Sequence, residues 1–191
     1  TRTGKHCYTR TMEQLPTLIT FDGDARSGKG TIVSLVKDYL RDERGRRVML
    51  IDAGQIFRVL VVVCREAGVD LDSQDQIDAY LVDETRQTEA IARVKQVYRM
   101  PKADRETLLY SPTIGVDSAK IGARPLSQDF KDGLLRKWLR DARAEGFDTV
   151  LLDGRALGEV GSRLADEGLC RYVLELFFVC DPEVSAQRTL G

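Results

Sequence analysis

One short stretch of the sequence combines glycines, a lysine and hydroxyl residues at the spacing that phosphate binding requires. It runs Gly23-Asp24-Ala25-Arg26-Ser27-Gly28-Lys29-Gly30-Thr31. Glycines let consecutive backbone N–H groups turn inward, and a helix that begins at the end of such a loop adds the partial positive charge of its amino terminus. Lys29 can then reach the terminal phosphates as a mobile point charge. We therefore expect this loop to bind a nucleoside triphosphate, with Lys29 as a catalytic residue.

The residues on either side give the loop the context of a P-loop, with a strand before it and a helix after it. The apolar run 18–21 predicts a buried strand, and apolar residues between Ile32 and Leu40 recur at helical spacing. The alternative, a glycine-rich turn with an exposed lysine, is disfavoured by these flanks. The usual motif has Ser or Thr directly after the lysine, whereas here Gly30 stands there and Thr31 follows. This GKGT form is typical of nucleoside monophosphate kinases, so we expect Thr31 to hold Mg²⁺ largely through water.

Two further groups of polar residues follow apolar runs that predict strands. Asp153-Gly154-Arg155 follows the run 149–152, and Asp52-Ala53-Gly54-Gln55-Ile56-Phe57-Arg58 follows the run 48–51. Ligands of parallel sheets bind beyond the carboxyl ends of the strands. We therefore expect Asp153 to orient Mg²⁺ through water and Arg155 to bind a phosphate in bidentate fashion. Arg58 projects from the same side, where it is either a phosphate ligand or a solvated surface arginine.

Strands and helices are expected to alternate along the chain, which predicts an α/β fold with a parallel sheet. A fourth strand is expected at 172–180. Helices are expected at 32–40, 111–122 and 129–145, the last ended by Gly146, together with one long exposed helix at 73–98. Another helix is expected to have Arg58 in its first turns and to continue through Leu60 to Ala67. The basic residues of 129–145 fit a nucleic-acid face, but the acidic residues between them favour an ordinary solvated helix face.

The composition limits the classes of partner and compartment. A chain of 191 residues that is 42% hydrophobic suits one globular domain. Its 29 basic and 30 acidic side chains leave a net charge of −1, which gives no reason to expect a nucleic acid or a membrane as partner. Four cysteines without metal-ligand spacing predict a reduced cytoplasmic protein, and no apolar stretch has the length of a membrane span.

The first residues are expected to carry no chemistry. Residues 1–16 are polar and without periodicity, which predicts a flexible or vector-derived tail, and Met12 is the expected natural start. His6 is the only histidine and lies in this tail, so we assign it no role. Phosphoryl transfer does not depend on a histidine base, because it relies on positioning and on the stabilisation of charge.

Several motifs in this order resemble those of bacterial cytidylate kinases. The similarity runs from about Leu18 to the carboxyl terminus and includes ITFDGDARSGKGT, DAGQIFR, SPTIGVDSAKIGA, LLDGRALGEV and FFVCDPEVSAQR. The P-loop is generic, whereas the DGR motif and the SPTIG-like helix are fairly specific to that family. The resemblance implies a P-loop kinase three-layer sandwich over 17–191, with an inserted helical acceptor-binding subdomain at about 69–125. It also implies Mg²⁺-dependent transfer of a phosphoryl group from ATP to CMP or dCMP.

The resemblance implies roles for individual residues as well. The residues that it places at the acceptor are Asp52, Gly54, Arg58, Lys131, Asp153, Gly154 and Arg155. It also makes Arg155 and Arg188 catalytic, with Arg188 near the start of an arginine-bearing lid. Lys131 stands where the family has an arginine, and Ala53 and Ala156 stand where it has a serine and an aspartate. The family serine of the SPTIG-like helix corresponds either to Ala119 or, shifted by one position, to Ser118. The phosphate-binding residues are thus kept, while several groups that face the nucleoside are not.

Two other functions stay open at this point. One is a P-loop kinase that phosphorylates a different small molecule, and the other is a nucleotide-binding module without catalysis. The expected partners are a nucleoside triphosphate donor and a small nucleotide acceptor, and the sequence predicts no oligomeric state.

Overall fold

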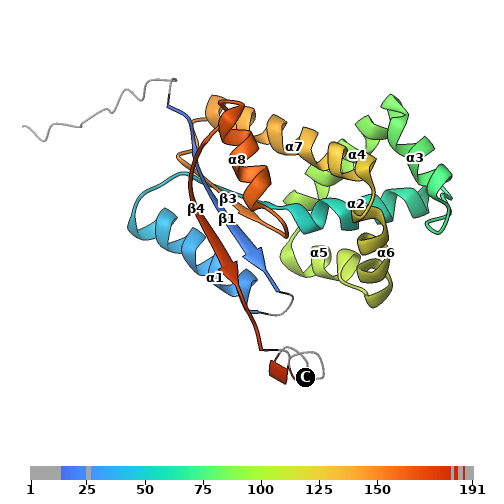
Figure 1. The fold of residues 1–191 in the computed structure, drawn as a ribbon, viewed down its shortest axis with the longest axis horizontal. Coiled ribbons are helices and arrows are strands. Elements are labelled where there is room, and N and C mark those ends of the chain that lie inside the picture. The colour runs from blue at the N-terminus through green and yellow to red at the C-terminus, as the bar shows by residue number, and fades with distance from the viewer. Residues whose placement is uncertain (1–13, 25–26, 182, 185–186, 188–191) are drawn as a thin grey trace, which may run out of the picture.

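The structure is a computed structural model of the chain, and it describes residues 14–24, 27–181, 183–184 and 187. Within this part the protein has four strands and eight α-helices, and helices and strands alternate at both ends of the described chain (Figure 1). The expected mixed α/β fold with a parallel sheet is confirmed.

The sheet is formed by strands that are all parallel to their neighbours. The strands are β1 (Thr17–Gly23), β2 (Val48–Asp52), β3 (Thr149–Asp153) and β4 (Arg171–Phe178). They lie in the order β2-β3-β1-β4, so β1 is central and the P-loop leaves the middle of the sheet. Asp52 at the end of β2 lies opposite Asp153 at the end of β3, and Asp153 lies opposite Phe21. This register brings the polar residues that follow three strands to one edge of the sheet.

Helices cover both faces of the sheet. The helices are α1 (Lys29–Asp38), which continues as a π-helical turn (Tyr39–Glu43), α2 (Ala53–Glu66), α3 (Gln74–Val82), α4 (Glu84–Arg99), α5 (Lys102–Leu109), α6 (Pro112–Gly122), α7 (Pro125–Ala144) and α8 (Gly158–Asp166). Val33 of α1 packs against Phe21 and Leu151 on one face. Residues of α7 and α8 pack on the other face against Leu18 and Leu152. The resulting three layers are helix, sheet and helix.

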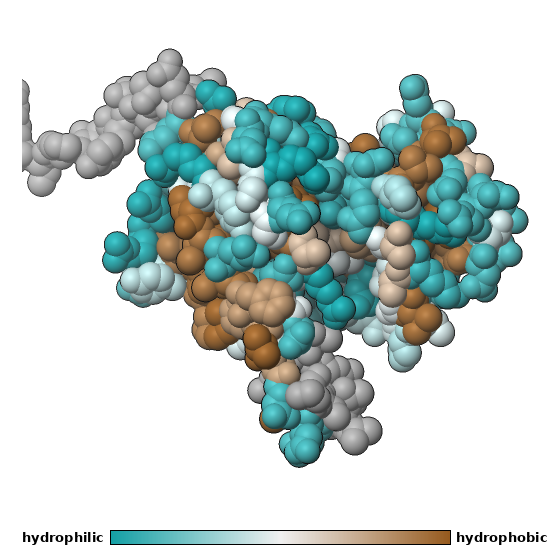
Figure 2. All heavy atoms as spheres, in the orientation of Figure 1, coloured by the Kyte–Doolittle hydropathy of each residue, from teal (hydrophilic) through white to brown (hydrophobic). Residues whose placement is uncertain are grey.

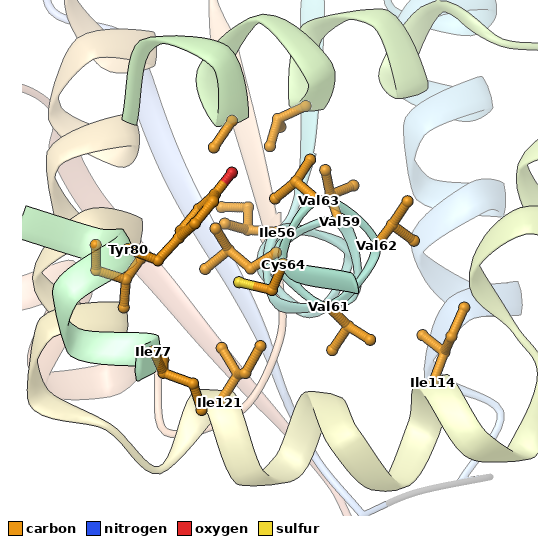
Figure 3. Packing of buried hydrophobic residues seen from close by; sticks show 14 of the residues in the cluster. Ile56, Val59, Val61, Val62, Val63, Cys64, Ile77, Tyr80, Ile114 and Ile121 are labelled. Carbon is orange, nitrogen blue, oxygen red and sulfur yellow. The ribbon is translucent and has the colours of Figure 1, made fainter. Parts of the chain in front are cut away.

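Helices α2 to α6 form a second packed unit beside the sheet, to its right in Figure 1. Its core surrounds α2, whose residues from Ile56 to Cys64 are buried on most sides. Figure 3 looks almost along α2 and shows side chains of α3 and α6 pointing toward it, among them Tyr80 and Ile121. A helix that is apolar nearly all round is expected to be buried in this way.

The prediction of one long exposed helix at 73–98 is wrong. The chain forms α3 and α4 instead, separated at Asp83, whose side chain accepts a hydrogen bond from the backbone N–H of Arg86 and so caps α4. Both helices bury apolar residues, because they pack on α2 and α7. α7 begins at Pro125 rather than Asp129, and α8 was not predicted.

β4 lies at the edge of the sheet and pairs only with β1 in the described part of the chain. Several of its apolar side chains face solvent, and Phe177 is 64% exposed. Figure 2 shows a hydrophobic area over β4 and the neighbouring α1, where Leu35 is 60% exposed. Among the helices that the structure describes, none has the length and apolar character needed to cross a membrane.

Candidate nucleotide-binding site

The P-loop begins where β1 ends, and two glycines shape it. Gly23 has φ 125°, and a side chain there would collide with the carbonyl oxygen of Phe178, so only glycine fits. Gly28 has φ 87° and is the residue before α1, which starts at Lys29. The backbone N–H groups in the first turn of α1 and the positive end of its helix dipole thus face the loop, as anion binding requires.

Asp24 and Ser27 are the described residues of the loop between Gly23 and Gly28. The Asp24 carboxylate accepts a hydrogen bond from the backbone N–H of Cys180 at 3.1 Å, so it holds the chain after β4. The Ser27 hydroxyl is buried without a hydrogen-bond partner in the described residues. A buried hydroxyl without a partner is costly unless a ligand satisfies it, and a phosphate oxygen is suitable. Ala25 and Arg26, which we also expected to bind the nucleotide, lie outside the described residues.

Lys29 connects the P-loop to the end of β3. Its ammonium Nζ lies 2.6 Å from the Asp153 carboxylate and donates a hydrogen bond to the Gly154 carbonyl at 2.5 Å. Both partners belong to the DGR motif, so the loop lysine and this motif form one cluster. A lysine held at the mouth of a P-loop can exchange this pair for the phosphates of a bound nucleotide.

The carboxylates of Asp52 and Asp153 lie close together at the ends of β2 and β3. Burial raises the pKa of Asp52, and the negative charge of Asp153 raises it further. Hydrogen bonds from the backbone and side chain of Gln55, together with the charge of Lys29, oppose this shift. A pair of like charges with one lysine beside it carries excess negative charge, which a bound cation would neutralise.

Three residues that the sequence analysis gave no firm role surround Asp52. Gln55 donates its backbone N–H and its side-chain Nε2 to the Asp52 carboxylate, at 3.1 Å and 2.9 Å. Tyr98 donates its hydroxyl to the Asp52 carbonyl, and the Tyr110 hydroxyl lies 3.5 Å from the Asp52 carboxylate. The D-x-x-Q spacing of Asp52 and Gln55 is a capping pattern that is visible in the sequence. The tyrosines come from distant segments and leave no local signal.

Asp22 was also missed, and it is a buried carboxylate of the loop region. It accepts hydrogen bonds from the backbone N–H groups of Gly23 at 2.6 Å and of Leu157 at 2.7 Å. It is 5% exposed. Asp22 therefore joins the start of the P-loop to the segment after the DGR motif.

The two expected phosphate arginines differ in their surroundings. Arg58 donates to the Leu109 carbonyl at 2.9 Å, and its guanidinium lies 4.5 Å from the centre of the Tyr110 ring. The Arg155 side chain is exposed and makes no hydrogen bond or ion pair within the described chain. Ala156, which follows it, has φ 52°, a left-handed conformation that costs a non-glycine residue about 1–2 kcal/mol.

The other expected acceptor residues occupy mixed positions. Gly54 lies in the first turn of α2, whereas Gly154 lies in the bend after β3. A side chain on Gly154 would come within 3.1 Å of the Ala53 side chain. Lys131 is buried in α7, where its ammonium is bound by Gln128 at 2.8 Å and Asp132 at 3.0 Å. The structure thus shows no contact of Lys131 with Asp52 or Asp153. Arg188 lies outside the described residues.

The expected Mg²⁺ site has few protein ligands. Asp153 provides a carboxylate, and Thr31 provides a hydroxyl in the first turn of α1. No group of three or more acidic, histidine or cysteine side chains converges in the described part of the chain. Mg²⁺ is commonly bound by one or two carboxylates, waters and substrate phosphates, so this donor set fits it.

The chain is similar to individual proteins of known name. No family model matches the chain. The chain is 30% identical to the cytidylate kinase of Vibrio cholerae over 150 residues, 75% of this chain and 58% of that protein. It is 28% identical to the cytidylate kinase of Deinococcus deserti over 131 residues, 69% of this chain and 60% of that protein. The chain is therefore a distant relative of the cytidylate kinases, and it spans about three fifths of their length.

Proposed function

From this distant relationship to the cytidylate kinases, we propose that the chain carries the nucleotide site of a nucleoside monophosphate kinase. The reaction is the transfer of a phosphoryl group from ATP to an acceptor. The relatives' name supports CMP as that acceptor, and the resemblance of the motifs adds dCMP. The observation that carries this proposal is the cluster of Lys29 with Asp153 and Gly154 at the carboxyl edge of a parallel sheet. Nucleotide kinases need a charged loop and a carboxylate at this place.

The proposed roles follow from the positions of the side chains. The P-loop, from Gly23 to Thr31, binds the ATP phosphates, with Lys29 and the Ser27 hydroxyl as ligands. Mg²⁺, when bound, neutralises charge on the transferring phosphates, and Asp153 and Thr31 would hold it through water. Arg58 and Arg155 bind the acceptor phosphate, with Arg155 also stabilising the transferred group, and Arg188 is assigned to the same chemistry by resemblance alone.

Acceptor choice would depend on the groups near Arg58 and Arg155. Asp52 and Gly54 precede Arg58 in one motif, and Gly154 precedes Arg155 in the other. The buried side-chain amide oxygen Oε1 of Gln55 has no hydrogen-bond partner in the described chain. Lys131 in its ion pair with Asp132 is a weaker candidate for a substrate contact. A kinase of another small acceptor remains the second candidate, because Ala53, Ala119 and Ala156 lack groups that would read a base.

The activity is tested by ADP release with CMP, dCMP, UMP and AMP as acceptors at fixed ATP. Lys29→Ala should reduce kcat by more than tenfold, because a loop lysine supports the charge of the transition state. Lys37→Ala, on the same helix but with its ammonium 3.5 Å from Asp38, is the control and should change kcat by less than about twofold. ATP binding without turnover of any acceptor would contradict the proposal and favour a binding module.

The acceptor side is tested with Arg155→Ala. Loss of a charge-assisted hydrogen bond of about 1.5–3 kcal/mol should raise the KM for the acceptor by at least about tenfold and leave the KM for ATP nearly unchanged. Arg99→Ala removes another exposed arginine, from α4, and should change neither value. Parallel loss of ATP and acceptor use would place Arg155 on the donor side instead.

A further inference from the structure

A cavity of about 420 Å³ lies at the end of the sheet opposite the P-loop. Its lining includes Thr17, Thr149 and Arg171, the first residues of β1, β3 and β4, together with Arg47 just before β2. β1 has seven residues. At about 3.3 Å per residue the cavity is therefore roughly 20 Å from the P-loop. It is separate from the nucleotide site described above.

Arginine dominates the polar lining of this cavity. Arg46, Arg47, Arg143 and Arg171 all line it, and they come from the turn before β2, from the end of α7 and from β4. The acidic residues in the lining are Glu145 and Asp148. The formal charge of the lining is thus +2, although the whole chain carries −1. Charge of one sign that gathers in a concave site concentrates the field on a ligand.

Two of these guanidinium groups are already held in place. Arg47 donates to the Glu145 carbonyl at 2.6 Å and lies 5.1 Å from the centre of the Phe147 ring. Arg171 donates to the Thr17 hydroxyl at 2.9 Å. Each guanidinium carries five N–H donors, so each keeps several donors for a ligand. A preoriented arginine loses less freedom when it binds.

The other two arginines are unpaired in the described part of the chain. The Arg46 and Arg143 side chains are exposed, and neither makes a hydrogen bond or ion pair with a described residue. On a helix or strand face that is simply exposed to solvent, arginines usually alternate with acidic residues and form ion pairs with them. Arg136 is an example, because its guanidinium lies 2.8 Å from the Glu167 carboxylate. Four arginines around one cavity depart from that pattern.

We propose that this cavity binds a small molecule that carries two or more linked phosphate groups. Planar guanidinium groups match phosphate oxygens in bidentate geometry, and four of them suit an anion with several charges. The volume lies within the range of small-molecule sites. Leu15, Ile19, Leu40 and Phe147 supply apolar lining for a part of the ligand without charge. The site is independent of the proposed phosphoryl transfer.

The proposal is tested by NMR titration of the ¹⁵N-labelled full chain with inorganic pyrophosphate at constant ionic strength. The backbone amides of Thr17, Phe147 and Arg171 report on the cavity, and those of Gly28 and Gly30 report on the P-loop. Lys29→Ala repeats the titration with the P-loop impaired. The cavity amides should shift with saturation in the wild type and in Lys29→Ala alike.

A pair of charge-matched variants assigns the binding to the cavity. Arg46→Ala/Arg143→Ala should weaken pyrophosphate binding at the cavity by at least about tenfold, since two charged donors are lost. Lys95→Ala/Arg99→Ala removes two exposed cations from α4, and it should leave that binding unchanged. Shifts at the P-loop alone, or equal weakening in both double variants, would overturn the proposal. A response of the cavity to a single-stranded oligonucleotide but not to pyrophosphate would overturn it too and identify a nucleic-acid surface.

Discussion

Asp52 shows how one residue serves both the fold and the candidate site. Its carboxylate caps α2 by accepting the backbone N–H of Gln55, and its backbone N–H donates to the Tyr98 hydroxyl at 3.1 Å. Burial raises the pKa of Tyr98 well above its ordinary value, so this phenol keeps its proton for the Asp52 carbonyl. The same carboxylate faces the charge of Asp153. Its position is therefore fixed by the fold, while its charge is unfavourable there.

Because the pKa of Asp52 is raised, we expect the stability of the fold to depend on pH through this residue. The pKa of Asp52 in the folded state lies above the ordinary value of 3.8. The contribution of Asp52 to stability is therefore fully present below pH 3.8, and it is lost as the pH rises through the folded-state pKa. Asn cannot ionise and caps a helix about as well as Asp. Asp52→Asn should therefore gain free energy of unfolding, relative to the wild type, as pH rises from about 4 to neutral.

Urea unfolding of both proteins across that pH range measures this difference. Asp38→Asn is the control, because Asp38 lies on the surface in an ion pair with Arg41 and should not produce a gain as pH rises. A difference between Asp52→Asn and the wild type that stays flat or falls with rising pH would show that the surrounding hydrogen bonds outweigh burial.

At the scale of elements, Asp22 joins the end of β1 to the segment before α8. Both of its carboxylate oxygens accept backbone N–H groups. In Asp22→Asn one oxygen becomes an NH₂ group that faces a buried donor, and the unsatisfied donor costs about 1–3 kcal/mol. We expect the free energy of unfolding to fall by about 2 kcal/mol, measured by urea denaturation.

The neighbouring aspartate provides the matched control for this change. Asp24 is exposed and bonds one backbone N–H at 3.1 Å, so Asp24→Asn should cost less than about 0.5 kcal/mol. Equal effects of the two substitutions would mean that the buried bonds of Asp22 do not hold the loop. A large loss of transfer activity in Asp22→Asn with unchanged stability would instead give Asp22 a direct role in the chemistry.

The sequence predicted the strands better than the helices. The runs before Asp52 and Asp153 are short and apolar, which is typical of strands in a parallel sheet that is buried on both faces. α8 left no such signal, because Gly158 and Gly161 are poor helix formers. They are there for packing, since a side chain on Gly161 would come within 2.7 Å of the Tyr172 ring. A contact with β4 thus explains these glycines, and local propensity could not show it.

The sequence predicted those residues of the candidate site that lie at or just after the carboxyl end of a strand. Lys29, Asp153 and Gly154 meet at the carboxyl edge, where sequence position alone places such residues. The tyrosines around Asp52 lie 46 and 58 positions away in sequence. Their approach depends on how α4 and α5 pack, and no periodicity in one segment contains that information. The same limit applies to the ion pair that holds Lys131.

At the scale of the whole molecule, the sheet and the helical unit share a boundary at Trp138. Trp138 of α7 packs against the core cluster around α2 and against the cluster on the sheet. Its ring centre lies 5.3 Å from that of Tyr98, whose hydroxyl reaches the backbone of Asp52. α7 and α2 therefore bury residues that belong to both parts, which favours unfolding as one cooperative unit.

The protein has a single tryptophan, so its fluorescence reports on this boundary alone, whereas far-UV circular dichroism reports on all helices. We expect the urea midpoints of the two signals to coincide, because neither part keeps its core when α7 leaves it. Two protein concentrations are needed, since the exposed apolar side chains on β4 favour association and would shift both midpoints together. Trp138→Phe supplies the baseline for fluorescence. A fluorescence midpoint at lower urea than the circular dichroism midpoint would show that the boundary opens first and that the helical unit and the sheet unfold separately.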